Sequence, residues 1–321
     1  MRALPPASTP EEFRPIRRDD GRLLPGVQVI CARHGLAGQD VVRFAGGSLP
    51  VYAVGSARVL KLYPPYHRSD FETELDALAL LAGRLPIPTP RVEATGGLDD
   101  WSYVLMERLH GRSLADAWPE FAPDERERLA DELGECLAAL HTPVHAIGAH
   151  GTRVPRPDWA GFVRRQRARC VEQQRARGLA PEWLEQIPAF LDALDPAALA
   201  APARDALLHT EVMREHLLVA PGDRGLALSG LFDFEPAMIG AREYEFASVG
   251  IFVACGDRAV LRRLLCAYGY RADALDLGLQ RRFMAYALLH TYSNLRWYLE
   301  RIPARASDRT LDDLAARWWA V

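Results

Sequence analysis

The chain has 321 residues, 49% of them hydrophobic, and a formal net charge of −3. This composition can bury a large core and excludes an intrinsically disordered chain. The small net charge gives no reason to expect nucleic acid or an anionic membrane as the main partner. The sequence also lacks an uninterrupted apolar run of about eighteen residues, so no membrane-spanning helix is expected.

Cysteine usage bears on the cellular compartment. Five cysteines are spread along the chain without a CxxC pair: Cys31, Cys136, Cys170, Cys255 and Cys266. An odd, scattered set is typical of reduced, buried thiols and not of a disulfide framework or a zinc site. The N-terminal segment has no apolar core of a signal peptide. Together these features predict a cytoplasmic protein.

The first part of the chain changes from helical to extended character. A short helix is expected at Thr9-Pro10, where a threonine cap precedes proline at the first helical position. Residues 26–36 are also predicted to be helical. Residues 41–63 contain three short runs rich in β-branched and aromatic residues, separated by Gly46-Gly47-Ser48 and Gly55-Ser56. This pattern predicts three antiparallel strands.

Lys61 stands between two leucines in the third predicted strand. Burying an unpaired ammonium costs several kcal/mol, so a lysine in a buried strand needs an acidic partner. The next predicted helix, residues 70–84, carries Glu72 and Glu74. The sequence leaves two alternatives, a buried Lys–Glu pair that grips phosphates or a solvent-facing lysine on an edge strand.

The remaining pattern predicts two lobes. Residues 91–94 and 102–107 are expected to be strands, and residues 123–141 a long amphipathic helix. Further helices are expected at 181–194, 240–252, 260–268 and 277–301, and a short docked helix containing Trp318 and Trp319. We therefore predict an α+β fold with a small antiparallel β-rich lobe in residues 1–108 and a larger, mostly helical lobe in residues 109–321.

Two helical segments leave alternatives open. Residues 153–177 are rich in arginine, which favours a solvated helix face over a phosphate or RNA site because no aromatic residues are interleaved. The 277–301 segment carries an aromatic set that either packs in the core or lines a substrate site. This set comprises Tyr286, His290, Tyr292, Trp297 and Tyr298.

The most informative residues lie between 207 and 235. His209 comes two residues before Glu211, and Glu211 comes five residues before His216. Asp233 then interrupts a second apolar run, and Glu235 follows it after one phenylalanine. Polar residues at these steps after apolar segments are typical of a phosphoryl-transfer catalytic loop followed by a metal-binding strand end.

Taken in order, these features resemble the aminoglycoside phosphotransferase and choline kinase-like family, relatives of the protein kinases. The resemblance covers residues 41–298, and residues 49–92 are similar to the hygromycin-type phosphotransferases. It implies a two-lobed protein-kinase-like fold with ATP, or alternatively GTP, between the lobes. It also implies Mg²⁺, with Mn²⁺ as the alternative, at the phosphates.

The resemblance implies a role for each matching residue. The nucleotide contacts are Gly46, Gly47 and Ser48 over the phosphates, Lys61 held by Glu74 (with Glu72 as the second choice), and Glu107 to Leu109 as the hinge at adenine. Asp233 corresponds to the metal ligand and His209 to the residue that supports the catalytic loop. Glu245 stands where the family usually has an aspartate.

Two positions depart from the family pattern. Glu211 replaces the catalytic aspartate and carries its carboxylate about 1.5 Å further, a displacement that can cost about a hundredfold in rate. His216 replaces a metal-ligating asparagine, and its nitrogen suits Mn²⁺ or Zn²⁺ better than Mg²⁺. Glu235 is a candidate for the missing oxygen ligand. Alternatively, His216 binds no metal and hydrogen-bonds Glu211.

The primary hypothesis is a small-molecule O-phosphotransferase acting on an aminoglycoside-like or other natural product, which also suggests antibiotic resistance as a role. Acids near the motif would suit a cationic substrate unless they pair with Arg214 and Arg242; they are Glu211, Glu215, Glu235, Glu243 and Glu245. The alternative is a nucleotide-binding pseudokinase without phosphotransfer. A third hypothesis is nucleotidyl transfer on the same fold.

Overall fold

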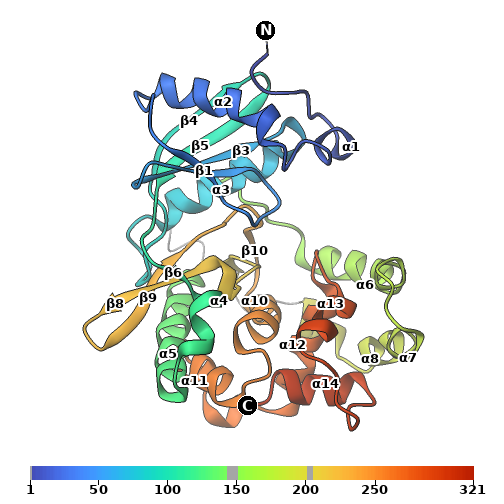
Figure 1. Cartoon of the computed structure of the whole chain (residues 1–321). Coiled ribbons are helices and arrows are strands. Elements are labelled where there is room, and N and C mark those ends of the chain that lie inside the picture. Colours follow the sequence, from blue (N-terminus) through green and yellow to red (C-terminus); the bar gives the residue numbers. More distant parts are fainter. Residues whose placement is uncertain (1, 143–150, 201–204) are drawn as a thin grey trace.

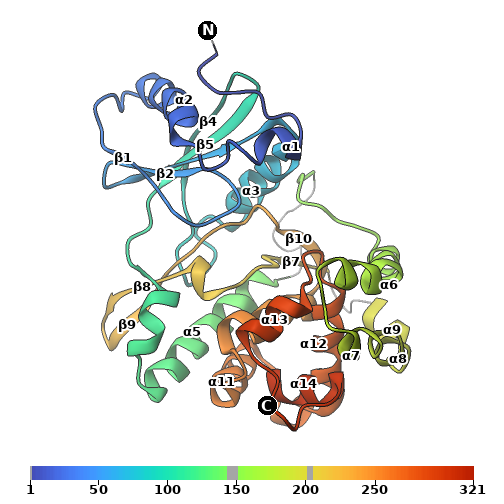
Figure 2. The ribbon, with the colours of Figure 1, turned by 45° about the vertical axis from the view of Figure 1, so that its right-hand side comes forward.

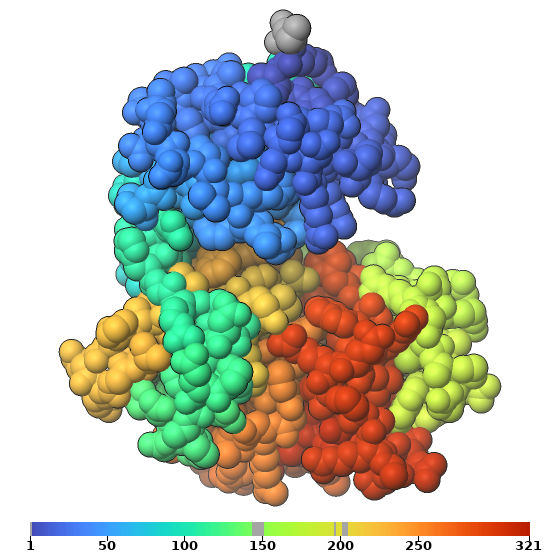
Figure 3. Space-filling view, in the orientation of Figure 1, coloured from blue at the N-terminus to red at the C-terminus, as the bar shows by residue number. Residues whose placement is uncertain are grey.

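The computed structural model describes residues 2–142, 151–200 and 205–321. An N-terminal lobe containing a sheet lies above a larger helical lobe, as Figures 1 and 2 show from two directions. The space-filling view in Figure 3 shows the front face hollowed between the two lobes. Each lobe has its own buried cluster, one drawn from residues 4–106 and the other from residues 77–319.

The N-terminal lobe is built on one antiparallel five-stranded sheet with the order β1-β2-β3-β5-β4. Its strands are β1 Val41–Arg43, β2 Val51–Val54, β3 Arg58–Tyr63, β4 Val92–Leu98 and β5 Trp101–Glu107. The central place of β3 follows from its composition, since its last four residues are buried. The hairpin turn after β4 is narrower than expected and consists of Asp99 and Asp100, which both have positive φ.

Three helices accompany this sheet, namely α1 Pro10–Phe13, α2 Asp20–Arg33 and α3 Arg68–Leu81. Helix α1 begins as predicted, with Thr9 accepting from the N–H of Glu12. The prediction of a helix at 26–36 was wrong in its start, because Asp19 caps the first turn and Pro25 is accommodated inside the helix. Helix α3 spans the lobes, since Phe71 packs with the N-terminal cluster and Leu78 with the C-terminal one.

The C-terminal lobe is mostly helical and carries two small sheets, β6-β8-β9 and β10-β7. The strands are β6 Arg112–Ser113, β7 Asp205–Leu208, β8 Leu217–Gly222, β9 Gly225–Leu231 and β10 Met238–Ala241. The helices are α4 Leu114–Ala117, α5 Pro123–Leu140, α6 Trp159–Ala176, α7 Pro181–Leu184, α8 Ile187–Asp192, α9 Pro196–Ala200, α10 Glu245–Ser248, α11 Arg258–Tyr268, α12 Leu277–Leu289, α13 Leu295–Arg301 and α14 Leu311–Trp318, with a π-helix at Val249–Ala254.

Three further predicted helices differ from the structure. The 181–194 segment forms α7 and α8 with a break between them. The 240–252 segment begins as β10, because Gly240 pairs with β7 and its missing Cβ leaves room for the Trp159 ring. The 277–301 segment divides into α12 and α13, since His290 takes an extended conformation and Asn294 caps α13. The C-terminal helix α14 is docked as expected, and Trp318 and Trp319 are fully buried.

Candidate active site

Lys61 is the centre of a buried ionic cluster between the lobes. Only 5% of the residue is exposed. Its Nζ lies 2.8 Å from Glu74 Oε2, 2.5 Å from Asp233 Oδ1 and 2.7 Å from Glu235 Oε2. The structure confirms the buried pair and excludes the solvent-facing alternative. It also selects Glu74 over Glu72, because Glu72 pairs with Arg68 at 2.9 Å on the outer side of α3.

Three carboxylates around one ammonium leave an excess of negative charge. Burial lowers the pKa of Lys61, but the three carboxylates outweigh that effect and hold it well above its usual value. Burial acts to raise the pKa of Asp233, but the Lys61 and His216 side chains hold it well below its usual range. Burial raises the pKa of Glu235 to about 8 against the opposing charge of Lys61. Burial therefore favours the protonated form of Glu235 more than in a free carboxyl group, while the Lys61 ammonium favours the carboxylate.

The same cluster can hold a divalent cation. Carboxylate oxygens of Glu74, Asp233 and Glu235 all lie within 4.8 Å of one another. Three hard oxygen donors at this spacing, with an excess of negative charge, fit a small divalent cation. His216 lies beside this group and not within it, with its Nε2 3.4 Å from Asp233 Oδ2.

His209 supports the loop that leads to Glu211. Its backbone N–H donates to Glu245 Oε2 at 2.7 Å, and its Nε2–H donates to the carbonyl of Phe232 at 2.9 Å. Its Nδ1 accepts from the backbone N–H of Glu211 at 3.3 Å. Both ring nitrogens are thus engaged with the imidazole neutral, and burial lowers the pKa of His209 in agreement with this. The contacts fix the backbone on either side of residue 210.

Backbone strain lies on both sides of the site. Thr210 has φ +71° and Asp233 has φ +74°, both in the left-handed region. For a β-branched residue such as Thr210 this is a rare conformation that costs of order 1–3 kcal/mol and clusters at functional sites. The carbonyl of Thr210 accepts from His290 Nε2 at 3.2 Å, which holds the strained residue from the end of α12.

The Glu211 side chain has no hydrogen-bond or ion-pair partner among the described residues. Burial raises its pKa, with His216 acting in the opposite direction. The expected alternative, a hydrogen bond between His216 and Glu211, is present in another form. His216 Nδ1–H donates at 2.7 Å to the backbone carbonyl of Glu211 and not to its carboxylate.

The glycine-rich loop between β1 and β2 reaches the same cluster. Gly47 has φ +93°, a conformation that glycine adopts without strain. A Cβ at Gly46 would meet no atom within 4 Å, so the loop leaves open space there. Ser48 Oγ donates to Glu235 Oε1 at 3.1 Å, which joins the loop to the C-terminal lobe.

The chain passes between the lobes after β5. Glu107 is the last residue of β5, and its N–H donates to the Arg91 carbonyl at 2.9 Å. The side chain of Glu107 is exposed. The backbone N–H of Leu109 has no acceptor among the described residues. The segment thus offers an unpaired backbone donor at the place where a nucleotide base is expected.

A cavity of about 210 Å³ lies beside the cluster. Its lining comes from α3, the 235–238 segment and the end of α12, and consists of Ser69, Asp70, Thr73, Pro155, Thr210, Glu235, Pro236, Ala237, Met238, Tyr244, His290, Thr291 and Tyr292. Most of the exposed cavity surface is apolar, but six of the lining residues carry hydroxyl groups and two are acids, and no lysine or arginine is among them. The aromatic set is thereby divided, since His290 and Tyr292 line the cavity while Tyr286 is buried in the core.

Most acids near the motif are already paired. Glu215 pairs with Arg301 at 3.1 Å and Glu243 with Arg282 at 2.8 Å. Glu245 is fully buried against His209 and His141. The alternative that these acids pair with Arg214 and Arg242 is not observed among the described residues, because Arg214 donates to the carbonyl of Val253 and Arg242 lies over the ring of Tyr270. Negative charge for a ligand is therefore offered by fewer acids than the sequence suggested.

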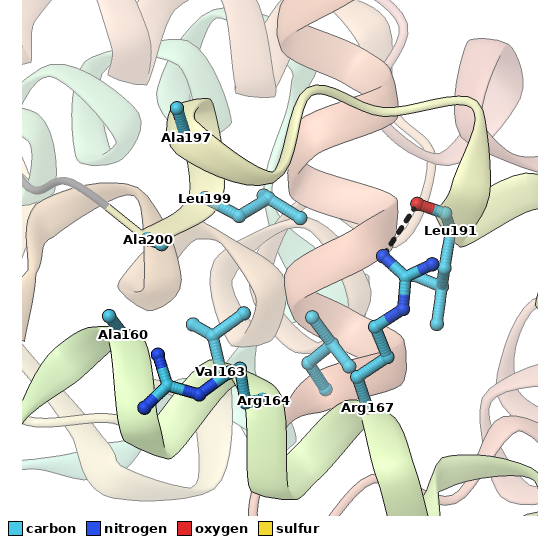
Figure 4. A pocket seen from close by; sticks show the side chains of 9 residues that line it. Ala160, Val163, Arg164, Arg167, Leu191, Ala197, Leu199 and Ala200 are labelled. Atoms are coloured by element: carbon cyan, nitrogen blue, oxygen red, sulfur yellow. Dashed lines mark hydrogen bonds between the residues drawn. The ribbon is translucent and has the colours of Figure 1, made fainter.

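The arginine-rich helix α6 does present a largely solvated face, as predicted. Arg164, Arg165, Arg169 and Arg175 are exposed. A separate cavity of about 400 Å³ lies between α6, α8 and α9, lined mainly by aliphatic side chains (Figure 4). Arg167 at its edge donates to the carbonyl of Leu191 at 3.2 Å. The residues lining this cavity include none of the Lys61 cluster.

Comparison with known proteins assigns the chain to a family. The model of the phosphotransferase enzyme family, APH, matches residues 40–279. The chain belongs to this family. As a member of the phosphotransferase enzyme family it is an enzyme, and the resemblance inferred from the sequence is confirmed at this level. No curated protein matches the chain.

Solved structures of phosphotransferases share its fold. The GDP complex of wild-type aminoglycoside 2'-phosphotransferase-IIIa has a TM-score of 0.69 at 20% identity, covering 92% of this chain and 96% of that one. The GDP and kanamycin complex of the same type of enzyme has a TM-score of 0.68 at 19% identity, covering 87% and 95%. Macrolide 2'-phosphotransferase MphH from Brachybacterium faecium has a TM-score of 0.60 at 21% identity, covering 92% and 98%. The predicted two-lobed protein-kinase-like fold is confirmed.

Two further expectations concern the chain as a whole. Among the described residues, no helix combines the length and apolarity needed to cross a bilayer. All five cysteines are unpaired, and three of them are buried.

Proposed function

We propose that the chain uses ATP, or alternatively GTP, to phosphorylate a hydroxyl group of an aminoglycoside-like or other natural product. The observation that carries this proposal is the ionic cluster, in which Lys61 contacts Glu74, Asp233 and Glu235 at 2.8, 2.5 and 2.7 Å. Beside it stands Glu211, whose carboxylate has no partner among the described residues. Phosphoryl transfer depends mainly on positioning and on charge stabilisation, and this arrangement supplies both.

For the nucleotide, Lys61 binds the phosphates while Glu74 holds its ammonium in place. Gly46, Gly47 and Ser48 cover the phosphates with backbone N–H groups, as glycine loops do. The free N–H of Leu109, with the carbonyl of Glu107, binds the base. Two similar structures are GDP complexes, which keeps GTP as an alternative to ATP.

For the metal, Asp233, Glu235 and His216 are the ligands available in this chain. When bound, a divalent cation neutralises negative charge on the transferred phosphoryl group. The oxygen cluster fits Mg²⁺, with Mn²⁺ as the alternative. Glu235 is held by Ser48 at Oε1 and by the Lys61 ammonium at Oε2.

For the acceptor, Glu211 is the catalytic base and His209 supports its backbone. The acceptor oxygen attacks the γ-phosphorus as Glu211 takes the hydroxyl proton, and the bond to the β–γ bridging oxygen breaks. The products are a phosphate ester and a nucleoside diphosphate. The raised pKa of Glu211 makes it a stronger base than an ordinary carboxylate. The adjacent cavity, with Asp70 and Glu235 and no lysine or arginine among its lining residues, suits a cationic acceptor.

The direct test is to incubate the protein with ATP or GTP, Mg²⁺ or Mn²⁺ and a panel of aminoglycosides and macrolides. Mass spectrometry should find a gain of one phosphoryl group on an acceptor. Asp233→Asn should abolish this gain, whereas Asp223→Asn, the same change in the exposed β8–β9 turn, should leave it intact. Full activity of Asp233→Asn would overturn the metal role of this residue.

The second candidate is a nucleotide-binding pseudokinase, favoured by the replacement of both usual polar residues by Glu211 and His216. It requires thermal stabilisation by nucleotide with no product under either metal. Nucleotidyl transfer is distinguished by release of pyrophosphate in place of the diphosphate. An increase in antibiotic tolerance of a susceptible host, seen with the wild type and not with Asp233→Asn, would support a resistance role.

Three finer assignments belong to the same proposal. The hygromycin-type subgroup rests on the similarity of residues 49–92. The boundary between the two lobes, placed between residues 108 and 109, rests on the two buried clusters. The second half of α3 is an exception, because it packs in the C-terminal cluster. A cytoplasmic location rests on the scattered, unpaired cysteines and suits an enzyme that consumes nucleoside triphosphate.

A further inference from the structure

A segment of the C-terminal lobe is hydrogen-bonded to helix α3 of the N-terminal lobe. Arg153 donates to the carboxylate of Asp76 from its backbone N–H at 2.5 Å, from Nε at 3.2 Å and from Nη2 at 2.5 Å. The hydroxyl of Thr152 donates to the same carboxylate at 3.3 Å. These bonds hold the pKa of Asp76 below its usual value, with Arg153 as the main cause. A bidentate arginine–carboxylate pair with backbone support is stronger than a single surface ion pair.

The same segment is fixed to the C-terminal lobe by its next two residues. Val154 is buried in the C-terminal cluster. The carbonyl of Pro155 accepts from the backbone N–H of Ile239, in β10, at 2.8 Å. In Figure 2 this stretch of chain rises from the start of α6 to the level of α3. Residues 152–155 therefore connect α3 to β10, the strand that shortly follows Glu235.

Helix α3 carries side chains of both proposed substrate sites. Glu74 lies 2.8 Å from Lys61 Nζ, and Asp70, one turn earlier, lines the cavity beside the cluster. Neighbouring helical residues are about 100° apart around the axis, so Asp76 points away from Glu74. Neither Asp76 nor Arg153 lines the cavity, so their contact holds α3 without occupying either site. A shift of α3 would move Glu74 and the cavity wall together.

We infer that Arg153 is a positioning residue for phosphoryl transfer, which holds Asp76 and thereby keeps α3 and Glu74 in the nucleotide-binding arrangement. The inference goes beyond the contacts assigned above and rests on the proposed function of the Lys61–Glu74 pair. Without the Arg153 contact, α3 occupies this arrangement for a smaller fraction of the time. The apparent Kd for nucleotide then rises by the inverse of that fraction. Saturating nucleotide selects the competent arrangement again, so kcat should change less than Kd.

The test measures nucleotide affinity, which requires no acceptor substrate. In calorimetric titrations with ADP and Mg²⁺, well below the unfolding temperature, Arg153→Met should raise the Kd by about 10-fold, the equivalent of one charge-assisted hydrogen bond. Arg153→Lys keeps the charge and the backbone hydrogen bond, so its Kd should lie between those of Arg153→Met and the wild type. Arg156→Met is the matched control, because Arg156 pairs with Asp205 of β7, within the C-terminal lobe, at 2.5 Å. This control should keep the wild-type Kd.

A double variant shows whether Arg153 acts through Asp76. Asp76→Ala should raise the Kd as Arg153→Met does, and the double variant should add little to either single change because both remove one contact. Hydrogen exchange of the backbone amides in residues 68–81 should accelerate in both single variants and not in Arg156→Met.

The measurements separate positioning from a merely structural contact. An unchanged Kd in folded Arg153→Met or Asp76→Ala, with only a lower unfolding temperature, would overturn the inference. If Arg153→Met does not fold, Arg153→Lys decides in its place, since a wild-type Kd in that variant would also contradict the inference. A raised Kd in Arg153→Met, combined with a wild type that binds nucleotide but transfers no phosphoryl group, would overturn the proposed function and leave the positioning role for nucleotide in place.

Discussion

Ser48 and Glu235 are 187 residues apart in the sequence, and the hydroxyl of Ser48 donates to Glu235 Oε1 at 3.1 Å. The other carboxylate oxygen of Glu235 lies 2.7 Å from Lys61 Nζ. Glu235 thus joins the glycine-rich loop of the N-terminal lobe to the lysine on β3. The contact occupies the space in which the phosphates are proposed to bind.

This relationship predicts how Glu235→Gln changes stability. Burial raises the pKa of Glu235 to about 8, well above the 4.5 of the free side chain. A raised carboxyl pKa gives stability that is present below the unfolded value and is lost as pH rises towards 8. With a chelator present, Glu235→Gln should therefore match the wild type near pH 5 and unfold at a higher temperature than the wild type at pH 9.

Divalent cations should reverse that difference. Because the neutral amide is a poorer ligand, millimolar Mg²⁺ or Mn²⁺ should raise the unfolding temperature of the wild type much more than that of Glu235→Gln. Thermal unfolding at pH 5, 7 and 9, with chelator or metal, measures both effects. A variant that is less stable than the wild type at pH 9 in chelator would show that the carboxylate is not strained by its neighbours.

Glu211 should be sensitive to the length of its side chain. Its backbone is held on both sides, by His209 Nδ1 at 3.3 Å and by His216 Nδ1 at 2.7 Å, so the loop cannot readily move to compensate. Glu211→Asp withdraws the carboxylate by about 1.5 Å and should lower kcat by roughly 10- to 100-fold. Glu211→Gln removes the base and should lower kcat by about 10²- to 10⁴-fold.

The KM for nucleotide separates this role from a structural one. Both Glu211 variants should keep it within about threefold of the wild-type value, because neither changes the Lys61 cluster. Steady-state kinetics at several acceptor concentrations supplies the measurement. A higher kcat for Glu211→Asp than for the wild type would contradict this prediction, because it would show that the fold does not position the longer side chain for catalysis.

Much of the site could be predicted from the sequence because its parts lie in short, regular segments. Strand periodicity and glycine turns located the three strands β1, β2 and β3 within residues 41–63, and a lysine between leucines required a buried acid. The following predicted helix offered Glu72 and Glu74 as that acid, and the family resemblance placed Glu74 first. The spacing of His209, Glu211 and Asp233 needed no long-range information.

The remaining features depend on contacts between distant segments. His290 reaches Thr210 only because α12 ends at residue 289, and the break before Asn294 is not visible in a continuous helical pattern. Strand β10 exists because it pairs with β7. Glu215 pairs with Arg301 and Glu243 pairs with Arg282. Neither acid pairs with the arginine that precedes it in the sequence, so sequence proximity did not identify these ion pairs.

Removing Lys61 should destabilise the protein without metal. Lys61→Met leaves Glu74, Asp233 and Glu235 without their cation in a buried site, and breaking a buried pair in this way costs about 3–5 kcal/mol. Urea unfolding at pH 7 in chelator should show this loss, and the double variant Lys61→Met/Glu235→Gln should recover part of it. Mg²⁺ or Mn²⁺ should recover more stability in Lys61→Met than in the wild type. Equal stability of Lys61→Met and wild type in chelator would contradict the cluster's electrostatics.

His290 should make folding sensitive to acid. Burial lowers its pKa to about 4, from an ordinary value of 6.5. The geometry agrees, because Nε2–H donates to the Thr210 carbonyl and Nδ1 accepts from the N–H of Tyr292, which leaves no place for a second proton. The unfolded chain takes up this proton below pH 6.5 while the folded protein does not, so stability is complete above pH 6.5 and is lost as pH falls towards 4. The full loss is on the order of 3 kcal/mol.

His290→Gln isolates this contribution. Its amide can still donate to the strained Thr210 carbonyl, but it does not titrate. The variant should be somewhat less stable than the wild type at pH 7, and its free energy of unfolding should fall less steeply between pH 6.5 and 4. Urea unfolding across that range measures both slopes, and His110→Gln, at an exposed position, should keep the wild-type slope. Parallel slopes for His290→Gln and the wild type would mean that His290 is protonated in the folded state, and its link to the catalytic loop would then need another explanation.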